Sequence, residues 1–221
     1  MPVKRSSPAP EPKFRREPAS LRREELVAAT LACLKKYGHE GVSVRRISAE
    51  AGVSMGLINH HFPGIAGLVA AAYESLTTTL LEASRARALA AGEGPVAGLH
   101  AFFEASFAPE ALDPALFRIW LVFWSLVPHS PDVRAVHDRN YEATRATLEA
   151  LLGRLRRLPG VPAFRVGAAA IGLEALIAGL WIELSLNPET FAAAEAIALC
   201  DDWVAALAAG AFPGMRAGRR G

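Results

Sequence analysis

The chain has 221 residues, a net charge of +2 and an apolar content of 52%, which is enough to build a sizeable core in one large or two small domains. Its apolar residues are rich in Ala and Leu, which are strong helix formers, and no run of alternating β-branched residues is present. This composition argues against a sheet and predicts an all-α fold of about nine helices.

The positive charge is concentrated in the first third of the chain. Residues 1–62 contain eleven Lys and Arg against six Glu, a net charge of +5, so the remainder carries −3. A basic segment suits contact with phosphates. Residues 1–19 include five prolines and are expected to form a disordered basic arm, either a solvated tail or a segment that reaches DNA. Its basic residues are Lys4, Arg5, Lys13, Arg15 and Arg16.

A long helix capped by Ser20 and ending at Tyr37 is expected to precede two short ones. The segment Ser43–Phe62 reads as a short helix, a turn and a second short helix, with a serine able to cap each helix and Gly52 suited to the positive φ of the turn. This is the local pattern of a helix-turn-helix, whose second helix can enter the DNA major groove. The alternative is an ordinary pair of short helices in an all-α protein.

Within this segment, Ile58 and Phe62 lie four residues apart and are expected to pack inward. The residues left on the outer face are the candidates for DNA contact. Arg45, Arg46, His60 and His61 would meet phosphates, Gly56 would let the backbone approach, and Met55, Leu57 and Asn59 would meet base edges. The predicted DNA-binding residues are Arg45, Arg46, Ser54, Met55, Gly56, Leu57, Asn59, His60 and His61. A metal site at the adjacent His60 and His61 is not expected, because neighbouring helical side chains diverge by about 100°.

Pro and Gly residues divide the rest of the chain into six further predicted helices. These are residues 65–91, 95–108, 114–127, 132–158, 163–186 and 188–211, followed by a flexible tail. The penultimate helix is the most apolar, but Glu174 and Glu183 interrupt it, which indicates a buried or interface helix and no membrane span. The last two helices are rich in Ala and Gly and would form a four-helix interface between two protomers, or would pack within one protomer.

Aromatic residues gather on the helix 114–127. Trp120 and Trp124 are four residues apart and share a face, with Phe117 and Phe123 nearby and Trp181 on the penultimate helix. Such residues form either ordinary core packing or a pocket that holds a cation against aromatic faces. These aromatic residues are candidates for effector binding.

The segment from Leu21 to Leu68 resembles the DNA-binding domain of the tetracycline-repressor (TetR) family, through REELVAATLACLKKYG and VSVRRISAEAGVSMGLINHHF. The stretches AGVSMGLINHHF, FRIWLVFWS and LEALIAGLWIELSL resemble the choline-sensing branch of that family. The resemblance implies a homodimer that binds double-stranded operator DNA and is released by a small-molecule effector, with choline or a related quaternary ammonium as the ligand. It divides the chain into an arm (1–19), a helix-turn-helix domain (20–64), an effector-binding and dimerisation domain (65–212) and a tail (213–221).

The chain departs from the family at several positions. Leu57, Asn59 and His61 stand where Thr or Tyr are common, Ile65 replaces a Lys that meets a phosphate, and Ala178 replaces an Asp of the choline-sensing relatives. These differences predict an unusual operator. Either Glu174 or Glu183 supplies the missing charge, or the ligand is a different one, and Glu174 joins the aromatic residues as a candidate for effector binding.

The remaining expectations concern compartment and chemistry. Cys33 and Cys200 are expected to be reduced core residues of a cytoplasmic protein, and the N-terminus lacks the apolar core of a signal peptide. The chain contains no Gly-rich phosphate loop, GxSxG, CxxC or HExxH motif, so an enzyme is not expected, nor is a cofactor. The alternative function is a DNA-binding protein of the same fold that is controlled by a protein partner and has no small-molecule effector.

Overall fold

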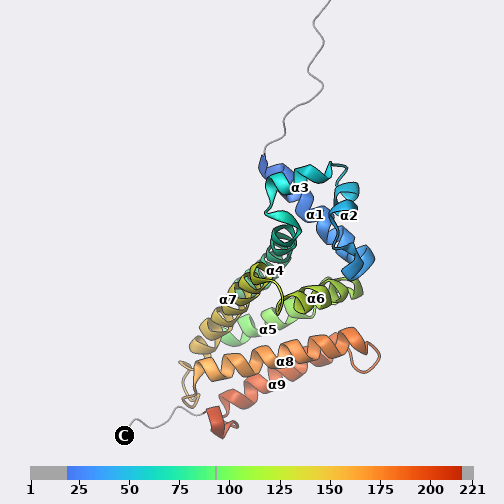
Figure 1. The fold of residues 1–221 in the computed structure, drawn as a ribbon. Coiled ribbons are helices and arrows are strands. Elements are labelled where there is room, and N and C mark those ends of the chain that lie inside the picture. Colours follow the sequence, from blue (N-terminus) through green and yellow to red (C-terminus); the bar gives the residue numbers. More distant parts are fainter. Residues whose placement is uncertain (1–18, 93, 216–221) are drawn as a thin grey trace, which may run out of the picture.

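A computed structural model describes residues 19–92 and 94–215 of the chain (Figure 1). Within these residues there are nine α-helices, two short 3-10 helices and no strand, which confirms the predicted all-α fold. Residues 1–18 of the predicted arm, which include all of its basic residues, lie outside the described residues. The α-helices are α1 (Ala19–Tyr37), α2 (Val44–Glu50), α3 (Met55–His61), α4 (Gly64–Ala90), α5 (Pro95–Ser106), α6 (Pro114–Leu126), α7 (Pro131–Leu155), α8 (Val166–Leu186) and α9 (Ala193–Ala208).

Helices α1, α2 and α3 form a small domain, called here the head, at one end of the molecule (Figure 1). Its core joins apolar residues of all three helices to the start of α4, among them Leu26, Ile47, Ile58 and Leu68. The 3-10 turn Gly38–Gly41 packs against α1, and a Cβ on Gly41 would lie 2.4 Å from the carbonyl oxygen of Cys33. Only glycine therefore fits at this point of the head.

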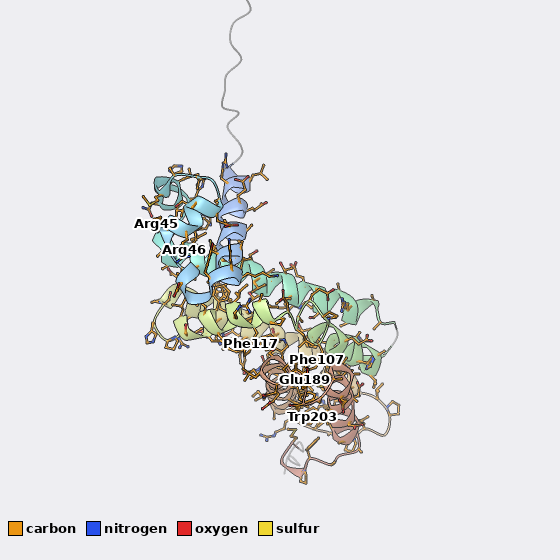
Figure 2. The ribbon with its side chains drawn as sticks, turned by 90° about the vertical axis from the view of Figure 1, so that its right-hand side faces the viewer. Arg45, Arg46, Phe107, Phe117, Glu189 and Trp203 are labelled. Carbon is orange, nitrogen blue, oxygen red and sulfur yellow. The ribbon has the colours of Figure 1, made fainter. Side chains whose placement is uncertain are left out.

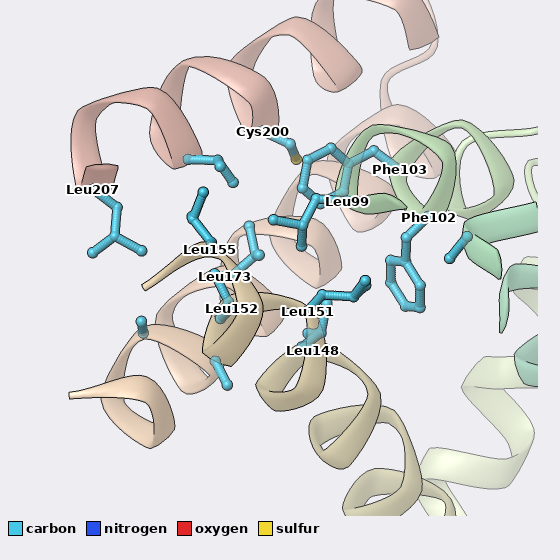
Figure 3. Packing of buried hydrophobic residues seen from close by; sticks show 14 of the residues in the cluster. Leu99, Phe102, Phe103, Leu148, Leu151, Leu152, Leu155, Leu173, Cys200 and Leu207 are labelled. Carbon is cyan, nitrogen blue, oxygen red and sulfur yellow. The ribbon is translucent and has the colours of Figure 1, made fainter. Parts of the chain in front are cut away.

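The long helix α4 leaves the head and packs against α5 and α7, while α8 and α9 lie side by side at the end of the molecule away from the head (Figure 1). The largest apolar cluster lies where α5, α7, α8 and α9 meet, and includes Leu99, Phe103, Leu152 and Leu173 (Figure 3). Cys200 is fully buried in it and Cys33 is buried in the head; both are free thiols.

The helices α4 to α9 are called here the body. A further apolar cluster joins the head to the body through Leu34 of α1, Tyr73 of α4 and Phe123 of α6. An ion pair crosses the same junction, because Lys35 Nζ donates to the carboxylate of Asp113 at 2.8 Å. Asp113 also caps α6 by accepting from the amide of Ala115, and the Lys35 hydrogen bond lowers the pKa of its carboxyl. The start of α6 is thus fixed to the end of α1.

Several predicted boundaries were wrong by a few residues. Helix α1 already begins at Ala19, so Ser20 lies inside it, and α7 ends at Leu155 where residue 158 was expected. The last helix begins at Ala193 and not at residue 188, because Asn187–Thr190 forms a turn and the Glu195 carboxylate accepts from the amide of Ala192 at 2.7 Å.

The predicted flexible tail is ordered where the structure describes it. Residues 213–215 form a 3-10 turn, and the carbonyl of Met215 accepts from the amide of Arg165 at 2.7 Å. Arg165 is the N-cap residue of α8 and has an extended backbone (φ −79°, ψ 103°), so the helix begins at Val166 and not at residue 163.

By length and composition alone, α4 and α8 are apolar enough to cross a membrane, although core helices of soluble proteins meet the same criterion. Helix α4 packs against α1 of the head and against α5 and α7 of the body. Helix α8 packs on α7 and α9 with Leu173 and Leu184 buried, and it carries two glutamates, Glu174 and Glu183. These contacts give both helices a packing role within the described part of the chain.

Candidate DNA-binding and effector sites

The local geometry of the helix-turn-helix follows the sequence closely. Ser43 caps α2, its hydroxyl accepting from the amide of Arg46 at 3.2 Å, and Gly52 has a φ of +65° in the turn, as predicted. Ser54 occupies the capping position of α3, but its hydroxyl makes no capping hydrogen bond; only its carbonyl accepts, from Leu57 at 3.0 Å. The Ser54 hydroxyl therefore stays at the surface, where a phosphate can reach it.

The outer face of α3 presents most of the predicted base-reading residues. Ile58 is fully buried and fixes the orientation of the helix, while Met55 is 57% exposed. Leu57 and His61 are half-buried, so they offer less surface to DNA than the sequence suggested. The exposed residues of this segment are Ser54, Met55, Gly56, Asn59 and His60. A Cβ on Gly56 would meet nothing within 4 Å, so its backbone is open to an approaching molecule.

The two arginines of α2, Arg45 and Arg46, both lie in the head (Figure 2), but they have different contacts. Arg46 folds back on the head, with its guanidinium 4.6 Å from the ring centroid of Tyr37 and 3.8 Å from the Glu40 carboxylate. Arg45 is exposed and makes no hydrogen bond or ion pair within residues 19–92 and 94–215. Arg45 is thus the better placed of the two for a phosphate contact.

Four of the predicted effector residues come together between α6 and α8. The ring centroid of Trp181 lies 5.4 Å from Phe117, 6.4 Å from Trp120 and 6.1 Å from Trp124. These four rings are called here the aromatic cluster. Phe123 lies outside it: this side chain is fully buried and stacks on Tyr73 at 4.4 Å. The spacing of Trp120 and Trp124 on one face identified the cluster, whereas Phe123 points to the junction with the head.

The aromatic cluster is packed on itself but is not sealed. Phe117 is buried, whereas Trp120, Trp124 and Trp181 are half-buried, and the Trp181 ring is fixed by donating Nε1–H to the carbonyl of Ala111 at 2.9 Å. Two surface grooves, of about 320 Å³ between α1 and α4 and about 220 Å³ between α4 and α7, are lined by other residues. Neither of these two grooves includes a ring of the aromatic cluster.

Glu174, the predicted countercharge, already has a partner. Its carboxylate accepts from Arg145 of α7 at 3.0 and 3.2 Å, and it is only 9% exposed. Burial raises the pKa of the Glu174 carboxyl, with the hydrogen bond from Arg145 acting in the opposite direction. Glu183, the other candidate, is exposed and accepts from the side chain of Asn187 at 2.9 Å.

Tyr73 is a residue that sequence reasoning missed. It is fully buried on α4, contacts the Trp120 ring at 5.5 Å and shares a hydrogen bond of 3.0 Å between its hydroxyl and His137 Nδ1. Burial raises the pKa of its hydroxyl far above the ordinary value. A single Tyr in an Ala-rich helix gives no signal in the sequence, yet it places α4 in direct contact with the aromatic cluster.

Apolar side chains are exposed on both α8 and α9, and this set of residues is called here the apolar stripe. Ile171, Ala175, Ala178 and Leu186 are exposed on α8, with Ile171 and Leu186 half or more exposed. On α9, Leu199 is 49% exposed. This stripe has the small and apolar character that the sequence predicted for a subunit interface.

Comparisons with known proteins agree with this geometry. Residues 26–72 match the model for bacterial regulatory proteins of the tetR family, and residues 95–209 match that for the BetI-type transcriptional repressor, C-terminal. The chain is 32% identical to a protein of Serratia proteamaculans named HTH-type transcriptional regulator BetI, over 83% of the chain and 91% of the relative.

Solved structures of transcriptional regulators share the fold of this chain. A structure described as a transcriptional regulator from Pseudomonas aeruginosa PAO1 is 45% identical, with a TM-score of 0.84 over 91% of this chain and 97% of that one. A regulator from Saccharomonospora viridis in complex with choline is 20% identical and shares the fold, with a TM-score of 0.71 over 84% of this chain and 96% of that one.

Proposed function

We propose a function for this chain from its membership of the tetR family of bacterial transcriptional repressors, with a BetI-type C-terminal domain. It acts in the cytoplasm as a homodimer that binds operator DNA. A quaternary ammonium compound releases it from that DNA. The observation that carries the proposal is the aromatic cluster, three tryptophans and a phenylalanine gathered between α6 and α8 of that domain. Aromatic faces attract quaternary ammonium groups through the ring quadrupole. The choline complex of a regulator with the same fold supports this ligand class.

The exposed residues of α3 would read the operator, with Asn59 able to bond an adenine edge and Met55 able to make apolar contacts. Arg45 would supply a phosphate contact from α2. Because a repressor dimer presents two recognition helices, its half-sites would lie about one helical turn, or roughly 34 Å, apart. The apolar stripe of α8 and α9 supports the dimer, since two copies would bury it against each other.

Ligand binding would act through differential affinity. A cation bound at the aromatic cluster favours whichever arrangement of the two heads leaves the ring faces available, and it shifts the equilibrium by no more than its difference in affinity for the two states. Tyr73 supports a route for this coupling, because it contacts Trp120 on one side and lies on α4, the helix that enters the head.

The test is a binding titration on a duplex from the DNA around the gene, at several salt concentrations, with and without choline. We expect specific binding at moderate salt that weakens when choline is added, and no effect of ethanolamine, which has the same alcohol but lacks the three N-methyl groups. Absence of specific binding would contradict the repressor function. Specific binding that choline does not change would favour the alternative of control by a protein partner.

A further inference from the structure

The recognition helix is too short to hold itself in place. Helix α3 has seven residues, fewer than two full turns, and isolated helices of this length are unstable in water. Ile58 is its one buried residue, and the carbonyl of Ile58 accepts from the amide of Phe62 just beyond the helix, whereas the carbonyls that follow need partners from outside α3. Contacts from outside α3 must therefore fix its C-terminal end.

Arg23 of α1 makes such contacts. Its Nη1 donates to the carbonyl oxygen of His61, the last residue of α3. The same guanidinium lies 4.2 Å from the ring centroid of Phe62, which follows α3 and is only 3% exposed. A cation at a helix C-terminus also interacts favourably with the helix dipole. One planar side chain therefore binds both the last carbonyl of the recognition helix and the aromatic residue that anchors it.

Resting on the proposed DNA-binding role of α3, we propose that Arg23 is a positioning residue for operator recognition. It holds the C-terminal end of α3 against α1, which fixes how far Asn59 and His60 project from the head. Arg23 need not contact DNA for this role. Its effect is on the geometry of base reading, which a small displacement of the helix impairs.

A phosphate contact by the Arg23 charge is the competing role, and the two have different signatures. Loss of a phosphate contact weakens binding to all sequences about equally, whereas loss of a base-reading geometry weakens only the specific complex. The neighbour Arg22 provides a matched control. It lies on the same helix, carries the same charge and pairs with Glu25 at 2.8 Å.

The experiment uses a duplex selected from a random pool by the wild-type protein and a scrambled duplex of the same length. Affinities for both are measured for wild type, Arg23→Ala, Arg23→Lys and Arg22→Ala. We expect Arg23→Ala to lower the specific-to-nonspecific affinity ratio about tenfold, as suits one hydrogen bond from a charged group, while Arg22→Ala leaves that ratio within about twofold. Arg23→Lys should restore little, because an ammonium lacks the planar fork that stacks on Phe62.

An equal loss of affinity for both duplexes, or full activity of Arg23→Lys, would overturn the proposal. Hydrogen exchange provides a second readout that needs no DNA: the amide of Phe62, which donates to Ile58 in the wild type, should exchange faster in Arg23→Ala than in Arg22→Ala. Equal exchange in the two variants would also count against the role of Arg23. A wild-type protein that selects no duplex would overturn the DNA-binding function itself, and the role of Arg23 with it.

Discussion

Arg145 of α7 binds the carboxylate of Glu174 on α8, with Nη2 3.0 Å from Oε2. The guanidinium also lies 4.4 Å from the ring centroid of Tyr141. The carboxylate that the sequence offered as a countercharge for an ammonium ligand is therefore already neutralised within the protein. A quaternary ammonium at the aromatic cluster would depend on ring faces for its binding, and this gives the first prediction.

Replacing Glu174 with Gln should leave the dissociation constant for choline within about twofold, since little of the attraction comes from this carboxylate. Isothermal titration calorimetry measures it. A much larger loss would place Glu174 in direct contact with the ligand.

The same variant tests the electrostatics of Glu174. Its folded pKa is raised by burial, so the stability linked to this group is fully present below the unfolded pKa and is lost as pH rises through the folded pKa. The unfolding free energy of the wild type, measured relative to Glu174→Gln in urea, should therefore decrease as pH rises above about 4.3, the ordinary pKa of Glu. A difference that grows with pH would contradict the raised pKa.

Removing a ring of the aromatic cluster should weaken ligand binding strongly. We expect Trp124→Ala to raise the dissociation constant for choline about 10- to 30-fold, because a desolvated cation–π contact contributes about 2 kcal/mol. Trp203→Phe is the control, since Trp203 packs on Phe212 away from the cluster. If both variants bind choline as the wild type does, the ligand does not bind at the cluster.

A substitution at Gly56 should impair DNA binding without impairing folding. A Cβ at this position meets no protein atom within 4 Å, so Gly56→Ala should fold and gain up to about 1 kcal/mol of stability from helix propensity. The added methyl group stands where the backbone approaches DNA, and operator affinity should fall at least about tenfold.

Gly153→Ala is the matched control for this variant, because Gly153 is also a helical glycine with open space around it, on α7 far along the chain. Thermal unfolding measures the stability of both variants, and a gel-shift titration measures their operator affinity. Unchanged operator binding by Gly56→Ala would exclude close approach of DNA at this point.

The apolar stripe on α8 and α9 predicts how the dimer would be disrupted. Ile171→Arg places a charge on a side chain that is 50% exposed in one protomer, and burying it unpaired against a second copy would cost several kcal/mol. Size-exclusion chromatography with light scattering should show a shift toward monomer. Leu89→Arg, at a position 81% exposed on α4, should leave the mass unchanged. A dimeric Ile171→Arg protein would locate the interface elsewhere.

Local patterns made most of the head predictable. Ser43 and Gly52 are capping and turn residues whose roles depend on their neighbours in the chain, so their geometry follows from sequence. The burial of Ile58 follows in the same way from helical periodicity. The contacts of Arg46 did not follow from local patterns, because its partners Tyr37 and Glu40 belong to two other elements, α1 and the 3-10 turn.

The helices, their order, the outward face of α3 and the shared face of Trp120 and Trp124 follow from the sequence, because all of these depend on spacings of a few residues. The folded chain alone shows that Arg145 binds Glu174, that Phe123 stacks on Tyr73, and that Arg23 binds the end of α3. The two residues of each contact are far apart in the chain: 29 positions for Arg145 and Glu174, 50 for Tyr73 and Phe123, and 38 for Arg23 and His61. Which distant helices meet is set by how their apolar faces pack together, and no local pattern in the chain encodes that choice.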